Sequence, residues 1–361
     1  MGRFFSIKYD RLRPYEPGEP IQQKKTIKLN TNESPYPASP FVYRSIDQFE
    51  IDNLRLYSDP SAEKLIKAIA KNFSLDESQV AVGNGSDELL ALVFMAFQNQ
   101  EGRVYFPELT YEFYSTCAEA FCGSKIEVPL GDELTIDPAD YCGLDGTIVL
   151  ANPNTPTGLA LTRAQVEAIL RANSDNLVVI DEAYGDYGAE SCVPLIEQFS
   201  NLLVIQTFSK SRNLAGARIG FAMGSPELIQ DMNRIKRAFH PHNINRLSVI
   251  AGTASMKDQD YFKKCINDVK RTREAVAKEL RTLGFTVLDS QANFLFARYP
   301  SLGGGAYCQA LKEKNILVKH SDSPKIVDYV RITIGTPEQM EQLLKATRDI
   351  LGIEELRDSE K

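Results

Sequence analysis

The sequence predicts an α/β fold in which a large domain, with a mostly parallel central sheet flanked by helices, precedes a small α+β domain. Three observations support this prediction. Short β-rich runs alternate with helical stretches between residues 80 and 224, as in proteins built from parallel strands and crossover helices. The chain has 361 residues, whereas single hydrophobic cores stop growing at about 250–300 residues. After Gly224 the regular alternation ends, which indicates a change of architecture.

The first two segments of the chain differ in composition. Residues 1–45 are rich in proline and polar side chains and predict an extended arm that belongs with the small domain. Residues 46–250 are expected to form the large domain, with strands in the runs VAVGN, RVYFPE, KIEVPL, TIVLANP, LVVIDEAY, LLVIQTFSK and RIGFAMG. Between several runs apolar residues recur at intervals of three and four, as in SDELLALVFMAF and LTRAQVEAILRA, which indicates helices that cover the sheet.

Residues 251–361 are expected to form the small domain. One helix is predicted just before it, from Pro226 to about Phe239, and a long helix from about Tyr261 to Leu283. The runs LGFTVLDSQANFLFARYP, NILVKH and YVRITIG follow, separated by helical patterns such as AYCQALKEK and PEQMEQLLKATRDILG. Strands and helices mixed in this way favour an α+β arrangement, and the chain shows no fixed-period repeat that would indicate a solenoid.

The composition argues against several classes of protein. A formal charge of −7 and a pI of 5.3 do not provide the dense basic surface that phosphate backbones attract, so we expect no nucleic-acid partner. No stretch approaches the about 18 apolar residues of a membrane span and no signal peptide is evident, so we expect a cytoplasmic protein without membrane association. The six cysteines form no CxxC pair, so neither a metal site nor a disulfide framework is expected.

A lysine follows the strand-like run LLVIQTFS, within the segment TFSKSRNLAGARIGFAMG. Ligands of open parallel sheets bind at the carboxyl ends of the strands, so Lys210 is well placed for a functional site. Its amine attacks a carbonyl only when it is neutral, and positive charge on Arg212 and Arg218 would favour that form. The alternative is an ordinary solvated loop lysine, against which the neighbouring residues argue.

Hydroxyl groups and a guanidinium beside this lysine predict a phosphate site. Thr207 and Ser209 are two residues apart, so their side chains point to the same side of an extended segment, and Arg218 follows in the glycine-rich run. The segment GNGSDELL follows a strand and opens a helix with Ser86 or Asp87 as its N-cap, and backbone amides at such a helix start attract anions. A tight turn and an ordinary capped helix are the alternatives.

Three further side chains complete the predicted pocket. Asp181 ends an apolar strand, where a carboxylate is costly unless it meets a cation or a strong donor such as a protonated pyridine nitrogen. Capping of the next helix is the alternative for Asp181. The run ANPNTPTG, which includes Asn154, places amide and hydroxyl groups at the same sheet edge, and Tyr111 is a candidate to stack on a ring. The set predicts a pocket for a phosphorylated pyridine aldehyde that reacts with Lys210.

These motifs occur in the order found in a known family. The runs TFSK, AGARIGF, NPNTPTG, DEAY and VRITIG resemble the fold type I pyridoxal-phosphate-dependent aminotransferases of class I and II. The runs RPYEPGEP, KLNTNESPYP, LYSDP, SQANFLF and ILVKHSDSP further resemble the histidinol-phosphate aminotransferases within that family. The resemblance spans roughly residues 13 to 350 and implies a homodimer with shared active sites.

The resemblance implies pyridoxal 5′-phosphate as the cofactor and gives roles to particular residues. Lys210 would form the Schiff base, Asp181 would pair with the pyridine nitrogen, and Tyr184 would donate to the phenolic oxygen of the ring. Tyr57 would reach the cofactor phosphate of the neighbouring subunit, with core packing as the alternative. Arg331 would grip the substrate carboxylate in a bidentate pair, with a surface position as the alternative.

Two positions depart from the family pattern. The family generally has asparagine directly before the PTG run, bonded to the cofactor's phenolic oxygen, whereas this chain has Thr155 there and Asn154 before it. Either residue could make that contact. Relatives often have arginine in the late ILVR segment, facing the substrate phosphate, whereas this chain has Lys319, which keeps the charge and loses the planar fork.

The resemblance implies transfer of an amino group between histidinol phosphate and 2-oxoglutarate, in histidine biosynthesis. Lys210 would also move a proton between the substrate Cα and the cofactor. Two alternatives on the same scaffold are an aromatic amino-acid aminotransferase and a decarboxylase of a phosphorylated amino acid. A sensor that binds the cofactor without turnover is disfavoured, because the arm before residue 45 is too short for a DNA-binding domain.

Overall fold

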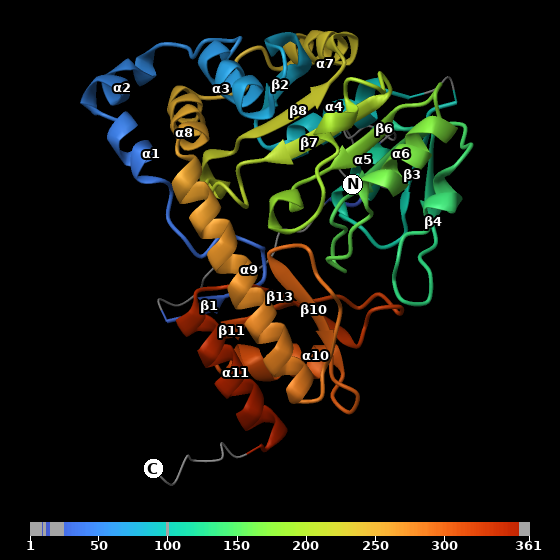
Figure 1. The fold of residues 1–361 in the computed structure, drawn as a ribbon, viewed down its shortest axis with the longest axis vertical. Coiled ribbons are helices and arrows are strands. Elements are labelled where there is room, and N and C mark those ends of the chain that lie inside the picture. Colours follow the sequence, from blue (N-terminus) through green and yellow to red (C-terminus); the bar gives the residue numbers. More distant parts are fainter. Residues whose placement is uncertain (1–8, 10–11, 15–24, 99–100, 354–361) are drawn as a thin grey trace, which may run out of the picture.

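The structure, a computed structural model, describes residues 9, 12–14, 25–98 and 101–353. Two parts lie one above the other in Figure 1, a larger part with the long sheet and a smaller part below it. The helix α9 (Gln259–Thr282) runs from one part to the other. The expected large and small domains are both present.

A seven-stranded sheet forms the centre of the large domain, in the order β2-β8-β7-β6-β5-β3-β4. The strands are β2 (Val80–Gly83), β3 (Arg103–Pro107), β4 (Ser124–Val128), β5 (Thr147–Ala151), β6 (Val178–Asp181), β7 (Leu202–Thr207) and β8 (Gly220–Gly224). Neighbours pair in parallel except β8, which is antiparallel to both β2 and β7. The prediction of a mostly parallel sheet is therefore confirmed.

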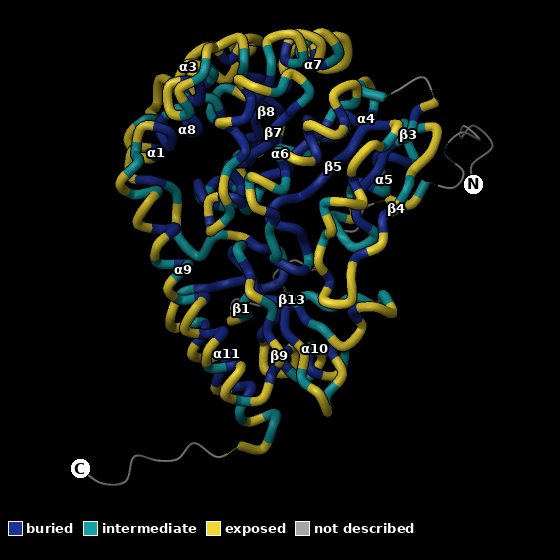
Figure 2. Tube along the Cα trace, turned by 45° about the vertical axis from the view of Figure 1, so that its right-hand side comes forward, coloured by how far each residue is buried: buried dark blue, intermediate teal, exposed yellow. Residues whose placement is uncertain are grey.

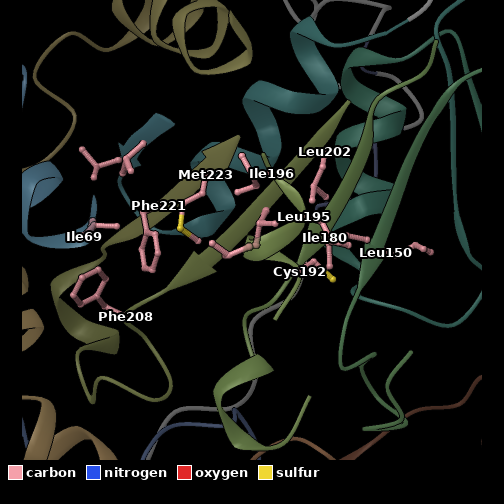
Figure 3. Packing of buried hydrophobic residues seen from close by; sticks show 14 of the residues in the cluster. Ile69, Leu150, Ile180, Cys192, Leu195, Ile196, Leu202, Phe208, Phe221 and Met223 are labelled. Carbon is pink, nitrogen blue, oxygen red and sulfur yellow. The ribbon is translucent and has the colours of Figure 1, made fainter. Parts of the chain in front are cut away.

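Helices cover both faces of this sheet, because alternate residues of each buried strand point to opposite sides. Apolar side chains of α3 (Glu63–Phe73), α6 (Arg163–Ala172) and α8 (Arg246–Lys257) form one core with one set of strand residues. Figure 3 shows part of this core, including Leu150, Ile180 and Leu202. The other set packs against α4 (Ser86–Ala96), α5 (Phe113–Phe121) and α7 (Pro226–Phe239).

The small domain is built on a four-stranded antiparallel sheet in the order β12-β13-β10-β9. Its strands are β9 (Thr286–Val287), β10 (Phe294–Arg298), β12 (Lys319–His320) and β13 (Tyr329–Thr333). The helices α9, α10 (Gly304–Glu313) and α11 (Pro337–Leu351) contribute to its core. The arm adds a strand to this domain, because β1 (Ile27–Lys28) pairs in parallel with β11 (Ile316–Leu317).

The packing of α8 favours a domain boundary near residue 258 rather than the expected position at 250. Residues Ala251, Ala254 and Met256 belong to the large-domain core. The helix contacts α3 and α1 (Pro40–Ser45), so the end of the arm also lies against the large domain. The next helix, α9, begins after Asp258, whose side chain accepts a hydrogen bond from the Tyr261 N–H.

Short helical turns connect the main elements. They are α2 (Gln48–Asp52) and the 3₁₀ helices η2 (Asn53–Arg55), η3 (Glu77–Gln79), η4 (Pro138–Tyr141), η5 (Gly185–Tyr187), η6 (Val193–Leu195) and η7 (Ala215–Ala217). The central strands are buried while the helices alternate buried and exposed positions (Figure 2). Among the described residues, no helix combines the length and apolar character needed to cross a membrane.

Candidate active site

A cleft of about 870 Å³ lies at the carboxyl ends of the central strands and is lined by both domains and the arm. Most of the predicted site residues line it. They are Ser86, Asp87, Tyr111, Asp181, Tyr184, Thr207, Ser209, Lys210, Arg218, Lys319 and Arg331. Asn154 and Tyr57 do not line it. Residues that span almost 250 positions of the sequence are thus gathered at one place, as expected for the carboxyl edge of a parallel sheet.

Lys210 projects from the loop after β7 and its amine is held by the arm. Lys210 Nζ donates a hydrogen bond to the Thr31 carbonyl at 3.1 Å and lies 5.7 Å from the centre of the Tyr184 ring. Arg212, which we expected to add positive charge beside the lysine, instead packs its guanidinium 3.6 Å from the Phe262 ring. The structure therefore assigns Arg212 to the junction with α9 rather than to the lysine.

The predicted phosphate side of the cleft is built from two adjacent backbone segments. The hydroxyls of Thr207 and Ser209 lie 3.0 Å apart, and the Ser209 N–H donates to Thr207 Oγ1 at 3.1 Å. The first turn of α4 lies directly against β8, since a Cβ on Gly220 would come within 2.3 Å of the Ser86 nitrogen. This close approach brings the N–H groups of a helix start beside the two hydroxyls, an arrangement that attracts an anion.

Asp87 binds two side chains at the predicted phosphate site, which we call the anion cradle. One carboxylate oxygen accepts from Arg218 Nη2 at 2.7 Å and the other accepts from the Tyr111 hydroxyl at 3.0 Å. Arg218 has a left-handed backbone, with φ of 51°, which only a few per cent of non-glycine residues adopt. Because a carboxylate repels a phosphate, we infer that Asp87 positions Arg218 and Tyr111 and would offer an anion its backbone N–H.

Asp181 places a buried carboxylate in the cleft, with only 4% of the residue exposed. Burial raises the pKa of Asp181 from 3.8 to about 6, although the hydrogen bonds it accepts from the Tyr114 hydroxyl (2.7 Å) and the Ala183 N–H (3.0 Å) oppose the increase. At neutral pH the group is mostly ionised. A buried carboxylate in this state is stabilised by a cationic partner, such as a protonated ring nitrogen.

Thr155, rather than Asn154, faces the cleft. Asn154 is 1% exposed and both ends of its amide are used inside the protein, because it donates to the Leu109 carbonyl (2.9 Å) and accepts from the Thr110 hydroxyl (2.8 Å). Thr155 lines the cleft and accepts a hydrogen bond from Arg331 Nη1 at 3.0 Å. Of the two residues that could contact the cofactor oxygen, the structure thus places Thr155, and not Asn154, in the cleft.

Two cations from neighbouring strands form the small-domain side of the cleft. Lys319 on β12 pairs directly with Arg331 on β13, so both side chains lie on one face of the sheet. Arg331 Nη2 donates to the Asn30 carbonyl at 3.1 Å, and its Nε is buried without a hydrogen-bond partner among the described residues. The pair is well suited to a substrate that carries a carboxylate or a phosphate.

Tyr57 lies outside the cleft of its own chain. It is 83% exposed and its ring stacks on His242 with ring centres 4.6 Å apart, so core packing is not its role. Other large apolar side chains are exposed in the same segment of α1, α2 and η2. They are Phe41, Tyr43, Phe49, Ile51, Leu54 and Leu56.

Sequence reasoning gave no role to four residues that the structure places at the site. Tyr114 donates to Asp181 from α5, and no helical spacing links it to Tyr111, which lies before that helix. Asn30, Thr31 and Asn32 lie in the run KLNTNESPYP, which contributed to the resemblance without a role. No local pattern predicts that this extended segment enters the cleft.

Comparisons with known proteins agree with this geometry. The family model for aminotransferase class I and II matches residues 24–346. The histidinol-phosphate aminotransferase of Brachyspira hyodysenteriae is 47% identical over 97% of this chain and 99% of that protein. The corresponding protein of a Marinomonas species is 45% identical over 97% of this chain and all of that one.

Solved structures show the same fold. The histidinol-phosphate aminotransferase of Sinorhizobium meliloti, solved with pyridoxal 5′-phosphate, superposes with a TM-score of 0.84 at 23% identity and covers 98% of both chains. The chain therefore belongs to the class I and II aminotransferases. Within them, its near full-length relatives place it in the histidinol-phosphate aminotransferase family.

Proposed function

We propose that the protein transfers an amino group between histidinol phosphate and 2-oxoglutarate, with pyridoxal 5′-phosphate bound in the cleft. One observation carries the proposal: the Lys210 amine, the buried Asp181 carboxylate and an anion cradle all open onto one cleft. Membership of the aminotransferase family supports the cofactor, and the names of the curated relatives support the substrates. We expect the reaction to take place in the cytoplasm, where the six free cysteines would remain reduced.

The residues present fit this cofactor. The start of α4, Thr207, Ser209 and Arg218 would hold its phosphate through N–H groups, hydroxyls and a guanidinium. Each Asp181 oxygen accepts one protein hydrogen bond and keeps capacity for another, so the carboxylate can also receive a protonated ring nitrogen. Tyr111 would cover one face of the ring.

The cofactor supplies an electron sink for a carbanion at the substrate Cα, and the protein determines which bond breaks. Lys210 would hold the aldehyde carbon of the cofactor, and its amine, when free, would accept the proton from the substrate Cα and return it to the aldehyde carbon. The Thr31 carbonyl, which accepts from the lysine amine, would keep it at the cleft. Asp181 would keep the ring nitrogen protonated, and Tyr184 and Thr155 would contact the phenolic oxygen.

The substrates would be bound on the small-domain side. Arg331 would pair with the carboxylate of glutamate in one half-reaction and with the phosphate of histidinol phosphate in the other, because histidinol phosphate has no carboxylate. Lys319, its neighbour across the strands, would add the second positive charge that a phosphate requires. The Thr155 hydroxyl orients Arg331 from the opposite wall of the cleft.

A homodimer with shared active sites is part of the proposal. The exposed apolar side chains of residues 41–57 form a contiguous stretch of chain of the kind that interfaces bury. Tyr57 lies within that stretch, is exposed and does not line the cleft of its own subunit. In the dimer it would reach the cofactor phosphate of the partner.

The test is a spectroscopic and half-reaction series on the purified protein. Pyridoxal 5′-phosphate should give the yellow lysine adduct with the wild type and with the surface control Lys67→Ala, and none with Lys210→Ala. Glutamate and histidinol phosphate should each convert the adduct, while 2-oxoglutarate should restore it. A wild type that forms no adduct would refute the proposal. Release of carbon dioxide, or much faster turnover of phenylpyruvate, would replace it with a decarboxylase or an aromatic aminotransferase.

A further inference from the structure

Three consecutive arm residues, Asn30, Thr31 and Asn32, line the cleft and contact its functional groups. The Asn30 carbonyl accepts from Arg331 Nη2 and the Thr31 carbonyl accepts from Lys210 Nζ, both at 3.1 Å. These two contacts use main-chain oxygens, so they depend on the path of the arm rather than on its side chains. The third residue makes its contact through a side chain.

Asn32 is held in one orientation by several hydrogen bonds. It is 1% exposed and has a left-handed backbone with φ of 56°, which asparagine tolerates better than most residues. Its N–H donates to Thr333 Oγ1 at 3.0 Å, and its carbonyl accepts from Asn293 Nδ2 at 3.0 Å. Both partners belong to the small domain, so the arm is fastened there while its side chain reaches Tyr184 of the large domain at 3.0 Å.

This network determines which atom of the Asn32 side chain meets Tyr184. The Thr333 hydroxyl already accepts the Asn32 N–H, so its own proton is available for Asn32 Oδ1, which lies 3.1 Å away. The amide Nδ2 is then directed at the Tyr184 hydroxyl and donates to it. Since the phenol oxygen accepts this bond, its proton is left for another acceptor, and Tyr184 lines the cleft.

We propose that Asn32 is a positioning residue that directs the Tyr184 hydroxyl proton toward the phenolic oxygen of the bound cofactor. The inference rests on the proposed function. A donor at the phenolic oxygen disperses its negative charge, so that oxygen attracts the proton of the neighbouring lysine adduct less strongly. Asn32 therefore acts, through Tyr184, to lower the pKa of the adduct between Lys210 and the cofactor.

The experiment is an absorbance titration of the cofactor-loaded protein against pH, which needs no turnover. Asn32→Gly removes the donor without adding charge, and glycine adopts a positive φ without strain. We expect the apparent pKa of the adduct to rise by about 0.5 to 1, the change that loss of one hydrogen bond of ordinary strength produces. An unchanged pKa would overturn the positioning role.

A double-mutant cycle separates this role from a merely structural one. Tyr184→Phe alone should raise the adduct pKa at least as much as Asn32→Gly, and adding Asn32→Gly to Tyr184→Phe should change it little further. A structural role would shift the pKa equally in both backgrounds, and that result would contradict the inference. Asn32→Gly should lower the free energy of unfolding of the cofactor-free protein by the same amount whether position 184 is tyrosine or phenylalanine.

Asn32→Asp is the second variant, in case the glycine variant does not fold. Aspartate tolerates the same backbone and still accepts from Thr333, but its carboxylate would accept a hydrogen bond from the Tyr184 hydroxyl and so reverse the direction of that bond. Its added negative charge should raise the adduct pKa both with tyrosine and with phenylalanine at position 184. We expect the rise to be larger when Tyr184 is present.

Failure of the wild type to form an adduct would refute the proposed function itself. A wild-type adduct that titrates without coupling to Asn32 would refute only this inference.

Discussion

The two walls of the cleft are built differently. The large-domain wall is carried by β6 and β7, whose residues are all buried and paired on both sides within the seven-stranded sheet. The opposite wall is carried by β12, a two-residue strand of intermediate exposure, and by the arm next to the two-residue strand β1. The groups expected to hold the cofactor are on the first wall, and those expected to hold substrate are on the second.

This difference indicates that the first wall serves the chemical step and the second wall serves substrate binding. A carboxylate or amine fixed on buried, fully paired strands keeps its position while the reaction proceeds, as electrostatic stabilisation requires. Short strands with few pairing partners can adjust, so one pair of cations can receive a carboxylate and a phosphate in turn. Substitutions in the sheet wall should therefore affect the chemical step with every substrate, whereas substitutions in the other wall should affect mainly the binding of substrate.

The largest effect is expected for Asp181→Asn. The amide cannot stabilise a protonated ring nitrogen, and loss of one partner of a buried ion pair costs about 3–5 kcal/mol, so kcat should fall by roughly 200- to 5,000-fold with both substrates. Steady-state kinetics and stopped-flow half-reactions would measure it. Glu182→Gln is the matched control, because Glu182 is the adjacent buried carboxylate and does not line the cleft. Equal losses of kcat in the two variants would show that removal of any buried carboxylate lowers the rate, whether or not the carboxylate lies in the cleft.

A smaller effect, on substrate binding rather than on the cofactor, is expected for Arg331→Lys. The lysine keeps the charge and loses the bidentate fork, so KM for 2-oxoglutarate should rise about 10- to 100-fold while the spectrum of the cofactor adduct stays unchanged. Kinetics of each half-reaction and an absorbance spectrum are the measurements. A change of the spectrum comparable to that of Asp181→Asn would mean that the two walls are not functionally separate.

The complementary change, Lys319→Arg, should separate binding of the phosphate substrate from binding of the carboxylate substrate at the second wall. The guanidinium adds a planar fork for phosphate, so KM for histidinol phosphate should fall about two- to fivefold while KM for 2-oxoglutarate stays within experimental error. Competition by inorganic phosphate would report the same preference. Equal changes for both substrates would indicate that Lys319 contributes only overall charge.

The smallest effect on turnover, with a clear effect on stability, is expected for Glu182→Gln. Burial raises the pKa of Glu182 from 4.5 to about 7, although hydrogen bonds from the Cys192 N–H, Ser191 and Gln206 oppose the increase. The folded protein thus binds this proton more tightly than the unfolded chain. Its contribution to stability is complete below about pH 4.5 and is lost as pH rises to about 7.

Glutamine does not titrate, so the wild type should lose stability relative to Glu182→Gln across that window. Each pKa unit corresponds to about 1.4 kcal/mol, which gives a total near 3 kcal/mol. Urea unfolding of the cofactor-free proteins at pH 4.5 and pH 7.5 would measure the change. A difference in unfolding free energy that is independent of pH would show that Glu182 keeps its ordinary pKa in the folded protein.

The sequence was sufficient for the large-domain wall. Each of the seven β-rich runs forms a strand, and the helix predicted from Pro226 to Phe239 has those bounds. Buried strands followed by polar side chains are a local pattern, so Asp181, Thr207 and Lys210 could be placed at one edge of the sheet from spacing alone. The long helix starts two residues before the expected Tyr261, because Asp258 caps it.

The other wall depends on contacts between distant segments. Pairing of Ile27 with Ile316 has no local signal in two-residue strands, so the entry of the arm into the cleft could not be foreseen. Positions 154 and 155 could not be distinguished, because the backbone of the turn, which residue types alone do not reveal, decides which side chain faces the cleft. No local pattern marks the domain boundary near 250, because only packing with α3 and α1 attaches α8 to the large domain.

The pairing of β1 with β11 also bears on how the enzyme is made. A ribosome releases the chain from its amino end, and domains fold as units when their residues have emerged. The large-domain sheet is complete in sequence at Gly224, whereas the strand partner of Ile27 is almost 300 residues away. A nascent chain should therefore acquire its reactive lysine long before the arm closes over it, and it should become competent for turnover only after Ile316 has emerged and paired with Ile27.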